Sequence, residues 1–209
     1  MSLLGQSKSR VRSAPERRSP GHPSRLVVVS LIAAIWCFWY AMYRAYYGLG
    51  GTVGMFRVPR SEDQWRTINL LGAGLLLVIA LLPLAILPLW KRPRIPPILL
   101  GLCWLLAVGF IMHALIDDIQ RILSLTGVLD LRYPLFITVN RRTADLQDLV
   151  FNETWVLIEG VLWGILGWMN LRSSRTRRWW IGTALAAVAV MSAIGLLTAF
   201  GALGKIIIS

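Results

Sequence analysis

The sequence is poor in the side chains that most often carry out chemistry. Its 209 residues include 2 histidines, 2 cysteines and 10 acidic residues. His22 lies in a polar N-terminal segment and no GxSxG motif is present, which argues against a hydrolase of the Ser-His-Asp type. Cys37 and Cys103 lie in apolar runs at different expected depths. We therefore expect two free thiols and no disulfide.

A nucleotide-binding site and a nucleic-acid-binding domain are also missing. The piece GLGGTVG, residues 48–54, resembles a phosphate-binding loop in composition only. Such a loop needs a preceding strand and a following helix, and neither is expected here. The 22 basic residues do not form a folded basic domain outside the apolar runs. We expect no cofactor and no nucleic acid partner.

Long apolar runs dominate the sequence instead, and 56% of its residues are hydrophobic. About 20 apolar residues are enough for a helix to cross the hydrocarbon core of a bilayer. The runs therefore predict an all-α, polytopic membrane helix bundle with five transmembrane helices, whose environment is the lipid bilayer. The predicted spans are residues 26–47, 69–90, 98–116, 151–170 and 179–208.

The charges predict a domain boundary and an orientation. Residues 1–24 are rich in serine, proline and arginine, which predicts a disordered basic tail before a membrane domain at 25–209. The first 25 residues and two short loops, 91–97 and 171–178, hold 13 of the 22 basic residues. Basic residues favour the cytoplasmic side, so we expect the N-terminus inside and the C-terminus outside. The excess of arginine over lysine suggests a GC-rich bacterial genome, hence a bacterial plasma membrane.

Polar and aromatic residues recur at helical spacing in three of the spans, so each set shares one face of its helix. Charged side chains within a bilayer need partners or water. We therefore expect these faces to meet near the outer membrane surface. The sets are Trp36, Tyr40, Arg44 and Tyr47 in the first span, Gly109, His113, Asp117 and Arg121 in the third, and Asp145, Asp148, Asn152, Trp155, Glu159 and Trp163 in the fourth.

Two hypotheses compete for this polar cluster. In the first, its charged residues form a structural network that joins three helices, and the protein has a structural or accessory role. In the second, the protein is a lipid- or sterol-like-ligand binding protein or an isomerase-type enzyme. Glu159 and His113 then exchange a proton with the ligand, with Asp117 as a further catalytic candidate. The ligand-binding candidates are Trp36, Tyr40, Arg44, Arg121, Asn152, Trp155 and Trp163.

The polar cluster is a poor candidate for a metal site. His113, Asp117 and Glu159 offer one nitrogen and two carboxylates, which is a poor zinc set, so we predict no metal.

Residues 133–139, in the outer loop before the fourth helix, fit either a short strand or a re-entrant segment. Thr143 is the predicted N-cap of the helix that follows.

Three pieces carry a resemblance to a known family: YYGLGGTVG after the first span, HALIDDIQRILSLTG at the end of the third, and DLQDLVFNETWVLIEG at the start of the fourth. They resemble uncharacterised bacterial multi-helix integral membrane proteins that are grouped as a domain of unknown function. The resemblance covers about residues 36–170. It implies a bacterial membrane location and no established activity, hence no catalytic residues to transfer.

Overall fold

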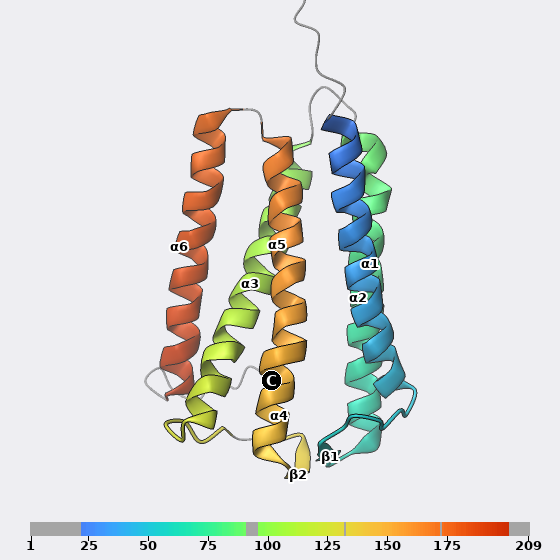
Figure 1. Cartoon of the computed structure of the whole chain (residues 1–209), viewed down its shortest axis with the longest axis vertical. Coiled ribbons are helices and arrows are strands. Elements are labelled where there is room, and N and C mark those ends of the chain that lie inside the picture. Colours follow the sequence, from blue (N-terminus) through green and yellow to red (C-terminus); the bar gives the residue numbers. More distant parts are fainter. Residues whose placement is uncertain (1–21, 91–95, 132, 172, 201–209) are drawn as a thin grey trace, which may run out of the picture.

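Five long helices run side by side along the long axis of the molecule (Figure 1). The computed structural model describes residues 22–90, 96–131, 133–171 and 173–200. Within these ranges, five helices are long and apolar enough to cross a membrane, which confirms the predicted all-α membrane bundle. Residues 22–24 of the predicted tail belong to the first helix. The rest of that tail, and residues 201–209 of the last predicted span, lie outside the described residues.

The first four membrane helices are longer than the apolar runs that predict them. The second begins seven residues before its predicted span, and the third ends nine residues after it, because polar residues extend both helices beyond the apolar core. The fourth is continuous over Arg141–Asn170 but contains a π-helical turn. The elements are α1 (His22–Gly48), α2 (Glu62–Trp90), α3 (Pro97–Leu125), α4 (Arg141–Gln147), the π-helical turn η1 (Asp148–Asn152), α5 (Glu153–Asn170) and α6 (Ser174–Ala199).

The turn η1 changes which residues share a face of the fourth helix. A π-helical turn adds one residue to the helix, so the residues after it are rotated by about 100° relative to a regular α-helix. The buried face therefore continues from Asp145 and Asp148 to Glu153, while Trp155 is only half-buried. In a regular α-helix, Trp155 would follow Asn152 on this face, so α-helical spacing in the sequence does not predict that Glu153 lies on it.

The bundle consists of two groups of helices. α1 packs mainly against α2, and α3 packs against α5 on one side and α6 on the other (Figure 1). Two indoles join the groups through α1 and α5. Trp36 Nε1 donates to the backbone oxygen of Trp155 at 3.0 Å, and Trp155 Nε1 donates to the backbone oxygen of Trp36 at 3.0 Å. The two rings stack at 4.2 Å, which adds apolar contact to the hydrogen bonds.

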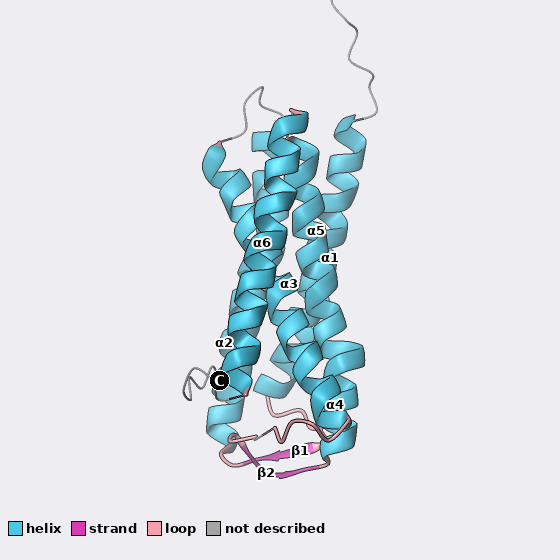
Figure 2. Ribbon diagram, turned by 90° about the vertical axis from the view of Figure 1, so that its left-hand side faces the viewer, coloured by secondary structure: helices cyan, strands magenta, loops and turns pink. Residues whose placement is uncertain are grey.

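A small antiparallel sheet closes one end of the bundle (Figure 2). β1 (Arg57–Pro59) lies in the loop between α1 and α2, and β2 (Phe136–Val139) lies in the loop between α3 and α4. Of the two structures expected for residues 133–139, the loop therefore contains the strand and not the re-entrant segment. The predicted cap at Thr143 is wrong: Asn140 directly follows β2, and its side chain accepts a hydrogen bond from the Thr143 backbone nitrogen.

Both cysteines are buried and free, as expected. Cys37 belongs to α1 and donates to the backbone oxygen of Leu76 in α2 at 3.3 Å. Cys103 belongs to α3 and lies in the same apolar core, together with Trp163 and Leu166 of α5. The small side chains of Cys37 and Cys103 let α1 and α3 lie close to their neighbouring helices.

Gly160 allows α3 and α5 to approach closely. A Cβ there would lie 2.8 Å from Ile111 Cγ1 and 3.0 Å from the Ile111 backbone nitrogen. We expect Gly160→Ala to lower the free energy of unfolding by about 1–3 kcal/mol, because the two backbones must move apart. Thermal unfolding in detergent measures the change.

Gly164 provides a matched control one turn further along α5. A Cβ there would meet Ala107 Cβ at 3.7 Å, an ordinary contact. Gly164→Ala should leave stability unchanged or slightly higher, since alanine is the better helix former. Equal losses in both variants would contradict the packing that the structure shows.

Candidate functional site

The candidate site is a cavity of about 320 Å³ between the two groups of helices, beneath the sheet. α1, α2, α3, α4, η1 and α5 all contribute residues to its walls, and so do the strands β1 and β2. More than half of its lining residues are polar or charged, although it lies within a membrane bundle. The lining includes Tyr40, Tyr43, Arg44, Arg57, His113, Asp117, Arg121, Gln147, Asp148, Asn152 and Glu153.

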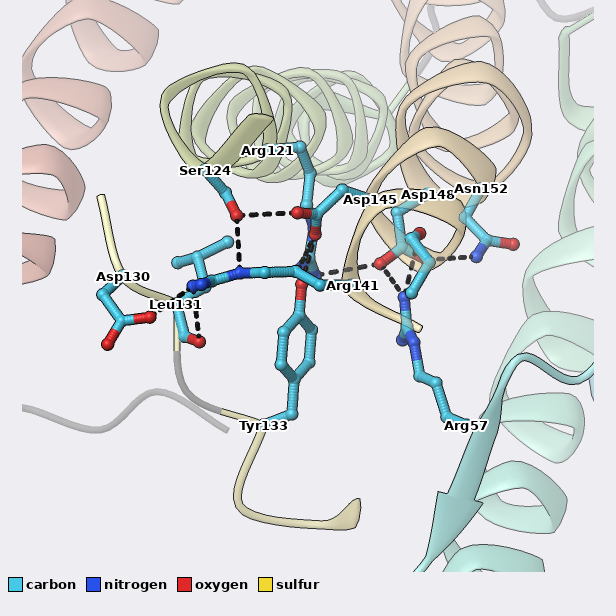
Figure 3. A network of polar contacts seen from close by, with 11 residues as sticks. Arg57, Arg121, Ser124, Asp130, Leu131, Tyr133, Arg141, Asp145, Asp148 and Asn152 are labelled. Atoms are coloured by element: carbon cyan, nitrogen blue, oxygen red, sulfur yellow. Dashed lines mark hydrogen bonds and ion pairs between the residues drawn. The ribbon is translucent and has the colours of Figure 1, made fainter. Parts of the chain in front are cut away.

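Asp145 is the centre of a hydrogen-bond network next to the cavity (Figure 3). Its side chain is fully buried. One carboxylate oxygen accepts from Ser124 Oγ at 2.7 Å; the other accepts from the Tyr133 hydroxyl and from Arg121 at 3.3 Å. Arg141 donates to Ser124 Oγ at 3.2 Å. Every polar atom of this buried carboxylate thus has a partner, which offsets the cost of removing it from water.

Asp148 is the second centre and belongs to the π-helical turn. It accepts from Arg57 of β1 and forms an ion pair with Arg121 of α3 at 3.1 Å. Asn152 donates to its other oxygen at 2.7 Å. Asp148 therefore ties the sheet and α3 to the fourth helix (Figure 3).

Tyr133 extends the network into the loop between α3 and α4. Its hydroxyl accepts from Arg121 at 3.0 Å and donates to Asp145. Burial and the hydrogen bond to the Asp145 carboxylate raise the pKa of Tyr133 to about 12. The phenol is therefore neutral and remains a hydrogen-bond donor at any physiological pH. The guanidinium groups of Arg57 and Arg121 also lie 5.4 Å from the centre of its ring.

A second cluster lies on the α3 side of the cavity. His113 Nε2 is 3.8 Å from Asp117 Oδ2 and 3.8 Å from Glu153 Oε2. Glu153 is 5% exposed, while the His113 side chain is 58% exposed. The cluster thus combines an accessible imidazole with a buried carboxyl group.

Glu159 lies elsewhere in the bundle. It follows Glu153 by six residues, about 9 Å along the axis of α5. It accepts from Trp163 Nε1 at 2.8 Å, and both side chains are buried. Among the described residues, no ion pair or hydrogen bond joins Glu159 to His113. The structure therefore offers no contact that supports proton transfer between these two residues.

The other predicted site residues fall into three groups. Tyr40, Arg44, Arg121, Asn152, Asp117 and His113 line the cavity. Trp36 and Trp155 join α1 to α5, and Tyr40 stacks on Trp155 at 5.9 Å. Trp163 is fully buried in the core with Glu159. The predicted polar faces thus meet at one end of the bundle, but only part of each face reaches the cavity.

Several residues of the site were not predicted: Arg57, Ser124, Tyr133, Arg141 and Glu153. Arg57 and its partner Asp148 are 91 residues apart in the sequence, so local spacing contains no sign of the pair. Glu153 was missed because the π-helical turn changes the helical phase.

The network predicts a strong dependence of stability on Asp148. Asp148→Asn removes the negative charge from two buried arginine contacts, and we expect it to lower the free energy of unfolding by about 3–5 kcal/mol. Asp130→Asn is the control, because Asp130 also pairs with an arginine but its side chain is 86% exposed. That change should cost less than about 1 kcal/mol. Denaturant unfolding in detergent gives both values, and similar losses would refute the importance of burial.

Comparison with known proteins places the chain in a family. The family model described as "Protein of unknown function (DUF3995)" matches residues 37–152, more than half of the 209 residues. The matched segment includes the sheet, α3, α4 and η1, and therefore most of the cavity lining. No curated protein and no solved structure matches the chain. The chain is an integral membrane protein of unknown biochemical function that belongs to this family.

Proposed function

We propose that this protein has an accessory role in the membrane and binds a small anionic molecule in the cavity beneath the sheet. The observation that supports this most directly is the state of the arginines that line the cavity. Arg57 and Arg121 both pair with Asp148. Arg44 also lines the cavity, and it has no carboxylate partner among the described residues.

The position of Arg44 supports a binding role over simple snorkelling to the membrane surface. Its guanidinium lies against Gly72 of α2, where a Cβ would be 3.4 Å from Arg44 Nε. Gly72 is three residues inside the apolar run that starts at residue 69. The charged group therefore lies against α2 within the apolar run, and a cation in such surroundings needs an anion.

Neighbouring side chains offer further hydrogen bonds to a ligand. The Tyr43 hydroxyl accepts from Gln147 Nε2 at 3.3 Å, which leaves its own proton available for donation. Asn152 Oδ1 is buried with no donor among the described residues. A ligand with a carboxylate or phosphate group would pair with Arg44 and accept a hydrogen bond from the Tyr43 hydroxyl. A hydrogen-bond donor on the same ligand would pair with Asn152 Oδ1. A lipid head group and a free solute both provide this chemistry.

We also propose a bacterial plasma membrane, with the N-terminus in the cytoplasm. The excess of arginine over lysine supports a bacterial source, and the distribution of basic residues supports the orientation. The start of α1, the end of α2 and the start of α6 lie at the end of the bundle opposite the sheet (Figure 1). The basic loops join helices at that same end.

Labelling with a membrane-impermeant maleimide in intact cells tests the orientation. Thr52, in the loop before β1, and Ser174, at the start of α6, are both exposed. Thr52→Cys should react in intact cells, and Ser174→Cys only after lysis. The native Cys37 and Cys103 are buried and give a low background. The reverse pattern would refute the proposed orientation.

Substitution of Arg44 tests the proposed binding. Inorganic phosphate, or an anionic phospholipid such as phosphatidylglycerol, should raise the unfolding temperature of the purified full-length protein. Arg44→Gln should weaken that effect by about tenfold to a hundredfold in concentration, since a charged hydrogen bond contributes about 1.5–3 kcal/mol.

Arg60→Gln is the matched control, because Arg60 is an exposed arginine at the same end of the bundle and does not line the cavity. A response to phosphate alone indicates a free solute, and a response to the lipid alone indicates a head group. No response to either probe, or an equal loss in both variants, would refute anion binding at Arg44.

A further inference from the structure

His113, Asp117 and Glu153 are arranged like the ligands of a metal site, with distances between their ligand atoms somewhat longer than in a bound site. One imidazole nitrogen and two carboxylate oxygens lie within 4.8 Å of one another. In a tetrahedral zinc site with bonds of about 2.0–2.2 Å, ligand atoms are about 3.3–3.5 Å apart. Side-chain shifts of about 1 Å or less would bring these three atoms to that spacing. All three residues line the cavity.

Ion pairing alone leaves this cluster incompletely satisfied. Both distances from His113 Nε2 to the carboxylate oxygens are 3.8 Å, longer than a hydrogen bond. Glu153 is 5% exposed, and its Oε2 atom has no hydrogen-bond donor among the described residues. A buried carboxylate oxygen without a partner costs free energy. A cation between the three side chains would remove that cost.

The charges around the cluster also favour a divalent cation. Asp117 and Glu153 carry up to two negative charges, and the neighbouring Asp118 raises this further. The nearest arginine of α3, Arg121, is already paired with Asp145 and Asp148. In a membrane bundle, such charge requires compensation from a bound ion or from a protonated group.

We propose that His113, Asp117 and Glu153 bind a divalent transition-metal ion that accepts mixed nitrogen and oxygen ligands. Mn²⁺ fits this set better than Zn²⁺, because one nitrogen and two carboxylates are a poor zinc set. The imidazole nitrogen distinguishes this set from the all-oxygen sites that Ca²⁺ and Mg²⁺ prefer. Three protein ligands leave at least one coordination position for water or a ligand in the cavity, as in metal sites that exchange ligands. Glu153 replaces Glu159 as the third member of the set considered in the sequence, because Glu153 and not Glu159 lies beside His113.

The π-helical turn is what makes this set available. It rotates α5 so that Glu153 follows Asp148 on the face that lines the cavity. His113 and Asp117 are four residues apart on α3 and therefore lie on the same face of that helix. The site is thus built across the contact of α3 with the fourth helix, the most extensive contact within its group.

Metal titration of the full-length protein in detergent tests the proposal. After removal of bound metal with a chelator, equilibrium dialysis with Zn²⁺ or Mn²⁺ and elemental analysis gives stoichiometry and affinity. We expect one ion per chain, and at least a tenfold loss of affinity in His113→Gln, which replaces an accessible side chain and should fold normally. Glu153→Gln should show a similar or larger loss.

Asp118→Asn is the matched control. It removes one negative charge beside Asp117 without removing a proposed ligand, so its affinity should change by less than about threefold. An equal loss in Asp118→Asn and His113→Gln would mean that only the general negative charge attracts the ion. That result, or the absence of stoichiometric binding by the wild-type protein, would overturn the proposal.

The test is separate from that of anion binding. Arg44→Gln should retain the metal affinity, since Arg44 is not one of the three ligands. His113→Gln should in turn retain a response to phosphate or phosphatidylglycerol if the anion binds at Arg44 alone. Each proposal can therefore fail without the other.

Discussion

The end of the bundle next to the sheet depends on two buried carboxylates. Asp145 and Asp148 lie on adjacent turns of the fourth helix, and both are bound by arginines from other elements. A buried carboxylate is stable only if its partners stay in place, because an unpaired charge away from water is costly. The two residues therefore hold α3, β1 and the loop between α3 and α4 in one arrangement.

This arrangement gives the cavity its shape and its chemical asymmetry. The network occupies Arg57 and Arg121 and leaves Arg44 on one side without a carboxylate partner among the described residues. On the other side it leaves His113 with two carboxylates at distances too long for hydrogen bonds. The stable part of the site thus has paired charges, while the parts that face the cavity retain capacity to bind a ligand.

Where the helices are regular, α-helical spacing in the sequence correctly predicts which residues share a face. It placed Arg121 and Asp145 on faces that meet, and it placed His113 beside Asp117. It failed at η1, where one additional residue rotates the helix and brings Glu153, not Glu159, next to His113. It also could not predict Arg57, whose short strand is stable only because it pairs with β2.

The sequence alone determined the number and class of the helices. Each apolar run must satisfy its own backbone hydrogen bonds in a membrane, and a helix does so without any other segment. Tertiary structure decided the site. Its contacts join residues up to 104 positions apart, and their energies depend on burial and on helix phase, neither of which is a local property of the chain.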